Sequence, residues 1–144
     1  MKLGILAVGR VKERFTQEWI DEFLKRLTKY CKLTINEIRE SSPSKEGEEL
    51  LKKIKDDDYV IALDIKGKSM SSEEFSSVLQ KRMMERNILF IIGGPDGWSA
   101  DVLKRANERI SFGAMTFTHQ IARMLLLEQI YRAMTIQHGG QYHK

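Results

Sequence analysis

Short apolar runs alternate with amphipathic runs along the whole chain. Strand character is expected at Leu3–Val8, Leu33–Ile38, Tyr59–Ile65 and Leu89–Ile92, and Ile110–Phe117 has the character of a strand or a loop. Helical spacing predicts a helix behind an N-cap at Thr16, a charged helix at Glu48–Lys55 after a loop at Ser41–Glu46, a helix capped by Ser71 or Ser72, a helix from Ser99 to about Arg109, and a last helix at Gln120–Ile136. This alternation predicts an α/β domain that has a mostly parallel sheet with helices on both faces.

In a sheet of this kind, ligands bind beyond the carboxyl ends of the strands. Those ends are expected at Gly9-Arg10, Asp64–Gly67, Gly93–Trp98 and Phe112–Phe117. The glycines of Gly93-Gly94-Pro95-Asp96-Gly97 allow close backbone approach to a ligand, although a tight turn between strand and helix explains them equally well. The spacing is neither the dinucleotide fingerprint nor a P-loop, so nucleotide phosphates are not the expected cargo. Small residues between apolar ones in Phe112–Phe117 suit a pocket for a flat ring, but ordinary strands also show this pattern.

The last predicted helix is apolar on all sides, which indicates burial on more than one side. We expect one side to cover the sheet and the other to meet a second subunit, with Leu126 and Ile130 as interface positions. Glu128 and Arg132 are spaced to form an i,i+4 pair. His119, at the start of this helix, has either a packing or capping role or a catalytic one.

The chain ends on Gly139-Gly140-Gln141-Tyr142-His143-Lys144, where two glycines form a hinge before an aromatic ring, an imidazole and a cation. Behind a well-anchored helix, such a tail indicates an element that contacts substrate. The alternative is an ordinary frayed terminus.

Composition narrows the class of protein. A chain of 144 residues with 42% hydrophobic and 31% charged residues fits one soluble globular domain over residues 1–144. The single cysteine, Cys31, forms no internal disulfide and favours a cytoplasmic location, and no apolar run is long enough for a signal or membrane-spanning segment. The three histidines lack the spacing of metal ligands, so no metal is expected.

The net charge is +4, and its distribution is uneven. Residues 1–32 hold eight Lys/Arg against four Asp/Glu, whereas residues 33–117 hold thirteen against fifteen. The basic loop Gly9–Arg14 lies at the expected ligand edge. It either holds phosphates of an RNA substrate or is a solvated loop.

Several motifs occur together in one order. They are Leu6-Ala7-Val8-Gly9, Leu63-Asp64, Ile92-Gly93-Gly94-Pro95-Asp96-Gly97, Phe112–Phe117, His119-Gln120, Leu127-Glu128-Gln129-Ile130-Tyr131-Arg132-Ala133 and Tyr142-His143-Lys144. This order resembles the bacterial RlmH family, which methylates N3 of a pseudouridine in 23S ribosomal RNA and belongs to the SPOUT class of S-adenosylmethionine-dependent methyltransferases. The resemblance covers essentially the whole chain, and it is most specific from Ile110 to Lys144. The chain departs from the family pattern at Trp98, Thr118, Gln141 and a short Arg39–Glu49 segment.

The resemblance implies a C-terminal trefoil knot, a homodimer, and a target in 23S ribosomal RNA within the assembled 70S ribosome, with no membrane and no metal. It implies that S-adenosylmethionine contacts Leu63, Gly93, Phe112, Gly113, Ala114, Met115, Thr116 and Phe117. His143 is the first candidate for assisting loss of the N3 proton, Arg132 is the second, and Tyr142 positions or stacks on the substrate.

Two other functions remain open. A ribosome-binding assembly factor without catalysis would keep the basic loop and the dimer but would need no methyl-donor pocket. A methyltransferase of the same fold that acts on transfer RNA is the second, and the Tyr142-His143 tail is evidence against it.

Overall fold

The computed structural model describes residues 2–144, which form five strands and five helices. The strands are β1 (Lys2–Val8), β2 (Lys32–Ile38), β3 (Tyr59–Ser69), β4 (Ile88–Ile92) and β5 (Glu108–Ser111). The helices are α1 (Arg14–Leu27), α2 (Pro43–Lys53), α3 (Ser72–Met83), α4 (Ala100–Arg105) and α5 (His119–Gln137).

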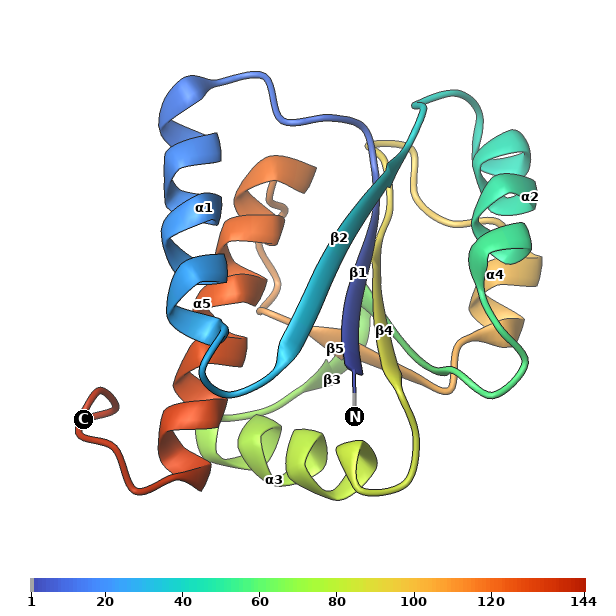
Figure 1. Cartoon of the computed structure of the whole chain (residues 1–144). Coiled ribbons are helices and arrows are strands. Elements are labelled where there is room, and N and C mark those ends of the chain that lie inside the picture. The colour runs from blue at the N-terminus through green and yellow to red at the C-terminus, as the bar shows by residue number, and fades with distance from the viewer. Residues whose placement is uncertain (1) are drawn as a thin grey trace.

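All five strands belong to one sheet with the order β2-β1-β4-β3-β5. Each of its four neighbouring pairs is parallel. Helices α1 and α5 cover one face together with α3, and α2 and α4 cover the other (Figure 1). The predicted α/β class, parallel sheet and two helical layers are therefore confirmed. The trefoil knot implied by the resemblance stays a prediction.

The central strands are buried on both faces, which explains their continuous apolar sequences. Along β1, Leu3, Ile5 and Ala7 join the core beneath α1, α3 and α5, while Leu6 and Val8 join the core beneath α2 and α4. Strand β4 divides its side chains in the same way. The period of two in a strand thus builds two separate apolar layers from one sheet.

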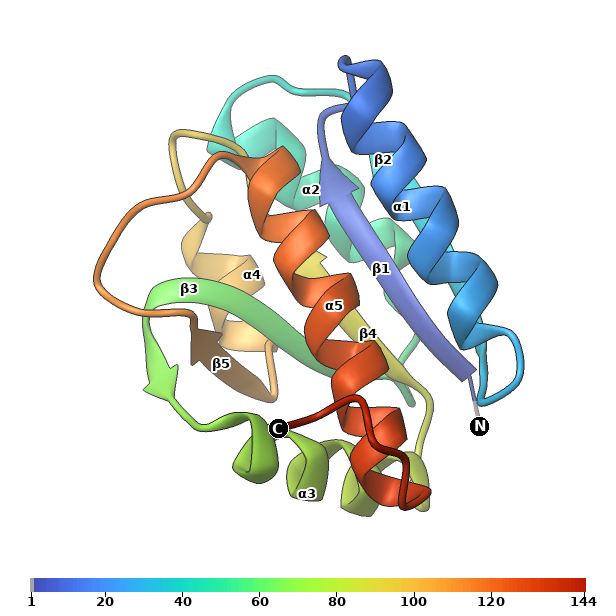
Figure 2. The same ribbon diagram turned by 90° about the vertical axis from the view of Figure 1, so that its left-hand side faces the viewer.

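Helix α5 lies between α1 and α3 on its face of the sheet (Figure 2). Leu126 and Ile130 are both 0% exposed and belong to the core. Their predicted place at a subunit interface is therefore wrong, because the helical period turns both of them toward the sheet. The outward side of α5 instead carries Ile121, which is 45% exposed.

Two predicted helix starts differ from the structure. Thr16 is not an N-cap, because α1 begins at Arg14 and Thr16 is already buried in its first turn. Helix α2 begins at Pro43, five residues before the predicted start at Glu48. Ser42 accepts a hydrogen bond from the Lys45 amide, and proline fits the first helical position because its missing N–H has no helical partner there.

The fourth helix ends at Arg105, earlier than the predicted Arg109. The helix does not continue because Asn107 pairs with β3. The Asn107 backbone amide donates to the Val60 carbonyl at 2.8 Å, and the Asn107 side-chain oxygen accepts from the Val60 amide at 2.8 Å. The chain then continues as β5 beside β3. A long-range contact therefore overrides the local helical pattern here.

We predict that Leu126→Ala destabilises the fold by about 2–5 kcal/mol, because it leaves a cavity between α5 and the sheet. Urea titration measures the free energy of unfolding directly. Met84→Ala is the control, since Met84 is 80% exposed and should change stability by no more than about 0.5 kcal/mol. Equal effects of the two substitutions would contradict the packing of α5 described here.

Candidate functional site

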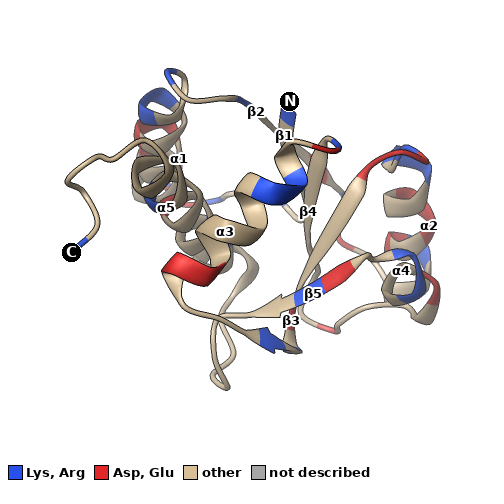
Figure 3. Ribbon diagram, turned by 90° about the horizontal axis from the view of Figure 1, so that it is seen from below, with Lys and Arg blue, Asp and Glu red and all other residues tan. Residues whose placement is uncertain are grey.

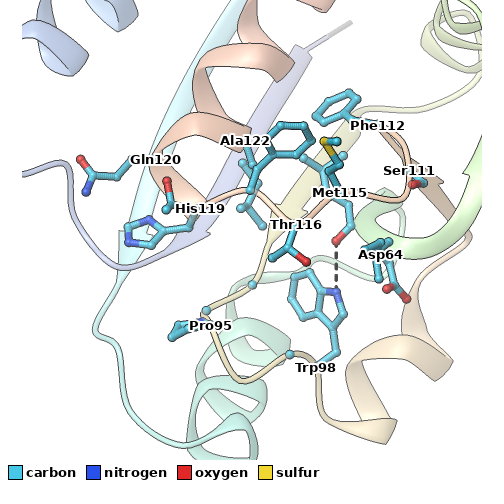
Figure 4. Close-up of a pocket in the computed structure, with 18 of the residues that line it drawn as sticks. Asp64, Pro95, Trp98, Ser111, Phe112, Met115, Thr116, His119, Gln120 and Ala122 are labelled. Carbon is cyan, nitrogen blue, oxygen red and sulfur yellow. Dashed lines mark hydrogen bonds between the residues drawn. The ribbon is translucent and has the colours of Figure 1, made fainter.

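A cavity of about 750 Å³ opens at the carboxyl ends of β3, β4 and β5. Parallel strands place all of these ends at one edge of the sheet, so segments far apart in sequence meet there. Figure 4 shows side chains from these loops and from the first turn of α5 around the cavity. It is lined by Glu40, Leu63, Asp64, Ile65, Ile92, Gly93, Gly94, Pro95, Gly97, Trp98, Ile110, Ser111, Phe112, Gly113, Met115, Thr116, Phe117, Thr118, His119, Gln120 and Ala122.

The structure brings the predicted cofactor residues together. Leu63, Gly93, Phe112, Gly113, Met115, Thr116 and Phe117 all line the cavity, whereas Ala114 does not. Of the four strand ends expected at the ligand edge, only Gly9-Arg10 lies outside the lining. The glycine loop and the Phe112–Phe117 loop therefore share one concave site.

Trp98 joins two of the strand ends, a role that sequence reasoning missed. Its indole N–H donates to the Leu63 carbonyl at 3.2 Å, as the dashed line in Figure 4 marks. A methyl group on Gly93 would lie 3.2 Å from the Trp98 ring, so glycine is what lets the indole pack on the chain. The sequence signal was present, since an aromatic residue with a polar N–H directly follows the glycine loop.

The loop after β5 is held by a few local hydrogen bonds. The Ser111 hydroxyl accepts from the Gly113 amide at 3.0 Å and donates to the Gly113 carbonyl at 2.9 Å. Gly113 has φ of +125°, a conformation that side-chain-bearing residues rarely adopt. Thr118 closes the loop as the N-cap of α5 by accepting from the Ile121 amide at 3.3 Å. These contacts leave Met115 79% exposed at the mouth of the cavity.

The charged residues that line the cavity are acidic. Glu40 and Asp64 line it, and none of its lining residues is Lys or Arg. Asp64 is partly neutralised by Arg109, whose Nη1 lies 3.2 Å from Oδ2. A cavity with carboxylates and no cation favours a positively charged ligand over a polyphosphate.

His119 lies at the other side of the cavity, against the end of β1. A methyl group on Gly9 would lie 2.9 Å from the His119 ring, and Gly9 has φ of +92°. Burial lowers the pKa of His119 below its ordinary value, and the charge of Arg123 lowers this pKa further. His119 is therefore a neutral ring packed on glycine, and of the two open interpretations this geometry favours packing. The predicted N-cap role belongs to Thr118 instead.

Arg123 is the buried cation of this region and was not singled out from the sequence. It is 1% exposed, pairs with Glu37 of β2, and donates to the Gly9 carbonyl at 3.1 Å. One arginine of α5 thus fastens the helix to the ends of β1 and β2. In the sequence, Arg123 could have been found as a basic residue within a helix that is otherwise mostly apolar.

The three predicted catalytic residues come together in a separate cluster at the far end of α5. Arg132 Nη1 lies 2.9 Å from His143 Nδ1, and the Arg132 guanidinium carbon lies 4.9 Å from the centre of the Tyr142 ring. Glu128 accepts from Arg132 Nε at 3.0 Å and from the Tyr142 hydroxyl at 3.1 Å. The tail is therefore bound to its own helix and is not a frayed end.

This cluster does not reach the cavity. None of His143, Arg132 and Tyr142 lines the cavity. Arg132 comes thirteen residues after His119 in α5, which corresponds to about 20 Å along the helix axis. Figure 2 shows the tail at the end of α5 opposite the loop that leads into the helix.

The basic loop Gly9–Arg14 lies beside the cavity. The Lys12 amide donates to the Gln120 side chain at 3.1 Å, and Gln120 lines the cavity. Arg10, Lys12 and Arg14 are exposed. On α2 and α4, by contrast, basic and acidic residues are interspersed (Figure 3).

Comparison with known proteins agrees with this geometry. Residues 1–143 match the family described as Predicted SPOUT methyltransferase. The chain belongs to the SPOUT methyltransferase family. It is 48% identical over 159 aligned positions to the Ribosomal RNA large subunit methyltransferase H of Clostridium botulinum (strain Langeland / NCTC 10281 / Type F), with both chains covered completely. It is 49% identical, again over the whole of both chains, to the protein of the same name from Alkaliphilus oremlandii (strain OhILAs). The resemblance inferred from the sequence motifs is thus confirmed.

Within residues 2–144, no helix combines the length and the apolar character needed to cross a membrane. Over the same described residues, His, Cys, Asp and Glu side chains do not gather in any group of three or more that could hold a metal ion.

We predict that the neutral state of His119 makes stability depend on pH. The folded protein binds a proton at His119 less tightly than the unfolded chain does. The free energy of unfolding should therefore have its full value above about pH 6.5 and should fall as the pH drops below that value. His119→Gln should lose less stability than wild type over this window. Urea titrations between about pH 7.5 and pH 5 measure both slopes, and identical slopes would contradict a buried neutral His119.

Proposed function

We propose that this protein transfers a methyl group from S-adenosylmethionine to N3 of a pseudouridine in 23S ribosomal RNA of the assembled ribosome. One observation carries the proposal: in a chain that belongs to the SPOUT methyltransferase family, the cavity at the strand ends is built from the two loops Gly93–Gly97 and Phe112–Phe117. The names of the relatives support ribosomal RNA of the large subunit as the substrate. Ribosomes as the target imply a cytoplasmic location.

The cavity fits the proposed cofactor in size and in charge. S-adenosylmethionine combines a flat adenine ring, whose faces are apolar and whose edge is polar, with a sulfonium cation, and when bound it supplies an already activated methyl electrophile. Gly93 and Gly113 expose backbone groups, Phe112 and Trp98 provide apolar ring surfaces, and Glu40 contributes negative charge. We infer that Leu63, Gly93 and the loop Phe112–Phe117 hold the cofactor, with Ala114 shaping the loop from outside the cavity.

The chemistry left to the protein is orientation and proton handling. Holding two reactants in line supplies several kcal/mol of the barrier, roughly 7 or more in well-oriented systems. The N3–H of the substrate has to leave before or during transfer, and a positioned imidazole accelerates such a step by about 10²–10⁴. We assign this role to His143, with Arg132 beside it and Tyr142 as the ring that contacts the substrate base.

A homodimer explains how this cluster reaches a cavity. The tail is bound about 20 Å along α5 from its own cavity, so we infer that it completes the site of a second copy. Exposed apolar side chains provide the surface for that copy: Phe15 is 69% exposed, Trp19 39%, Phe117 39% and Ile121 45%. Large exposed apolar residues near one another are typical of interaction surfaces.

The two alternative functions fit less well. An assembly factor without catalysis has no use for an acidic cavity lined by both loops. A transfer RNA methyltransferase is disfavoured because the relatives that match the chain completely are named for ribosomal RNA.

We predict that Gly93→Val strongly weakens binding of S-adenosylmethionine. A methyl group at this position already lies 3.2 Å from the Trp98 ring, so the larger valine should push the indole away from Leu63 and into the cavity. Calorimetry should show affinity lowered at least tenfold, roughly 1.4 kcal/mol. An unchanged unfolding midpoint is the control for folding. Wild-type affinity in this variant would place the cofactor elsewhere.

We predict that deleting Gln141–Lys144 lowers the single-turnover rate on ribosomes by roughly 10²-fold or more, while cofactor binding changes little. His143→Ala should lose about as much, and His119→Ala less. A mixture of the truncated protein with Gly93→Val tests the cross-subunit arrangement. In mixed dimers, the intact tail of one subunit meets the intact cavity of the other, so the mixture should transfer methyl groups far faster than either variant alone.

Failure of the mixture to recover activity, with mixed dimers present, would place tail and cavity in the same subunit. Wild-type transfer by the truncated protein would remove the tail from the mechanism altogether.

A further inference from the structure

His143 lies between an anion and a cation. Its Nδ1 is 2.9 Å from Arg132 Nη1, and its Nε2 contacts Glu73 Oε1 on the first turn of α3. A guanidinium has only N–H donors, and an ionised carboxylate has only acceptors. Nδ1 must therefore accept from Arg132, and Nε2 must carry the proton that is donated to Glu73. The ring is thus the neutral imidazole protonated at Nε2.

The orientation of the Arg132 guanidinium is fixed by several other contacts. Its Nε and Nη2 both donate to Glu128 Oε1, at 3.0 Å and 2.5 Å, and the Tyr142 ring stacks on its guanidinium. Tyr142 in turn donates to Glu128 at 3.1 Å. The N–H that faces His143 therefore has a direction set by α5 and by the tail itself.

Glu73, the other partner of His143, belongs to α3 and not to α5 or the tail. Its side chain is 63% exposed, and the turn that carries it is fixed by a capping box between Ser71 and Glu74. The hydrogen bond from His143 is the largest of the interactions that lower the pKa of Glu73 below its ordinary value, which agrees with an ionised acceptor. Glu73 is thus the contact through which α3 holds the ring against Arg132.

We propose that Glu73 is a positioning residue for the tail, which fixes His143 as the Nε2–H tautomer and leaves the lone pair on Nδ1. Under the proposed function, this is the form that can accept a proton. The substrate N3–H displaces the Arg132 N–H, the proton moves from N3 to Nδ1, and the electron pair stays on N3. This pair would form the bond to the methyl carbon as the methyl–sulfur bond breaks and its electrons remain on the sulfur of the leaving thioether. The resulting imidazolium keeps its Nε2–H bonded to Glu73, whose negative charge stabilises it.

The tautomer is measured directly by NMR on the full-length protein labelled with ¹⁵N-histidine. Long-range proton–nitrogen correlations distinguish a protonated from an unprotonated ring nitrogen, and a His143→Ala sample assigns the signals. Wild type should show Nε2 protonated and Nδ1 unprotonated. Glu73→Ala should release the ring from α3, so that it can turn away from Arg132 and give a mixture of both tautomers, whereas Glu73→Gln, whose amide oxygen also accepts from N–H, should keep the wild-type form. Glu85→Ala, which removes an exposed carboxylate paired with Arg82, is the matched control.

Kinetics supply the second measurement. Glu73→Ala should lower the single-turnover rate by roughly tenfold or more with cofactor affinity unchanged, since it disturbs a proton acceptor and not the cavity. A Glu73→Ala spectrum identical to that of wild type, or a wild-type His143 protonated at Nδ1, would overturn the inference. If the spectra change as expected while the tail-deleted protein keeps its wild-type rate, the tautomer assignment stands and the proposed role of the tail fails.

Discussion

The packing of α5 against the sheet is the contact on which the rest of the structure depends. Leu126, Leu127 and Ile130 are completely buried there, and the helix is flanked by α1 and α3. One helix therefore connects two groups of residues. Its first turn closes the cavity, and its last turns hold the tail about 20 Å away. Because this separation is fixed by core packing, the tail and the cavity of one chain stay apart.

Charged residues add contacts at both ends of α5 to the apolar packing of its middle. Arg123 is buried near the start of α5 and is compensated by Glu37 and by the Gly9 carbonyl. Breaking one partner of a buried pair is strongly destabilising, so this contact fixes where the helix starts relative to the ends of β1 and β2. At the other end, Glu128, Arg132, Tyr142 and His143 form a half-buried network that orders the terminal residues. The acidic cavity and this network form two chemically distinct sites on one helix.

Much of this arrangement could be predicted from the sequence, because the period of apolar residues fixes strands and helices locally. The apolar runs Tyr59–Ile65 and Leu89–Ile92 predict strands that the structure confirms as parts of β3 and β4, and the rule for parallel sheets places the loops after them at one edge. Contacts between distant residues could not be predicted in this way. The bond from Trp98 to the Leu63 carbonyl, and the pairing of Asn107 with Val60, depend on which strands become neighbours. The error at Leu126 and Ile130 has the same origin, since a helix that is apolar on all sides does not reveal which side meets the sheet.

We propose above all that this chain methylates a pseudouridine of the large-subunit ribosomal RNA. The most direct test incubates purified protein with S-adenosylmethionine carrying a labelled methyl group and with 70S ribosomes that lack the modification. Mass mapping of nuclease fragments from the 23S RNA then locates the label. We expect one labelled fragment, with the methyl group on N3 of a pseudouridine, and no label in transfer RNA supplied in parallel. Label in transfer RNA, or none in ribosomal RNA although the protein binds the cofactor, would contradict it.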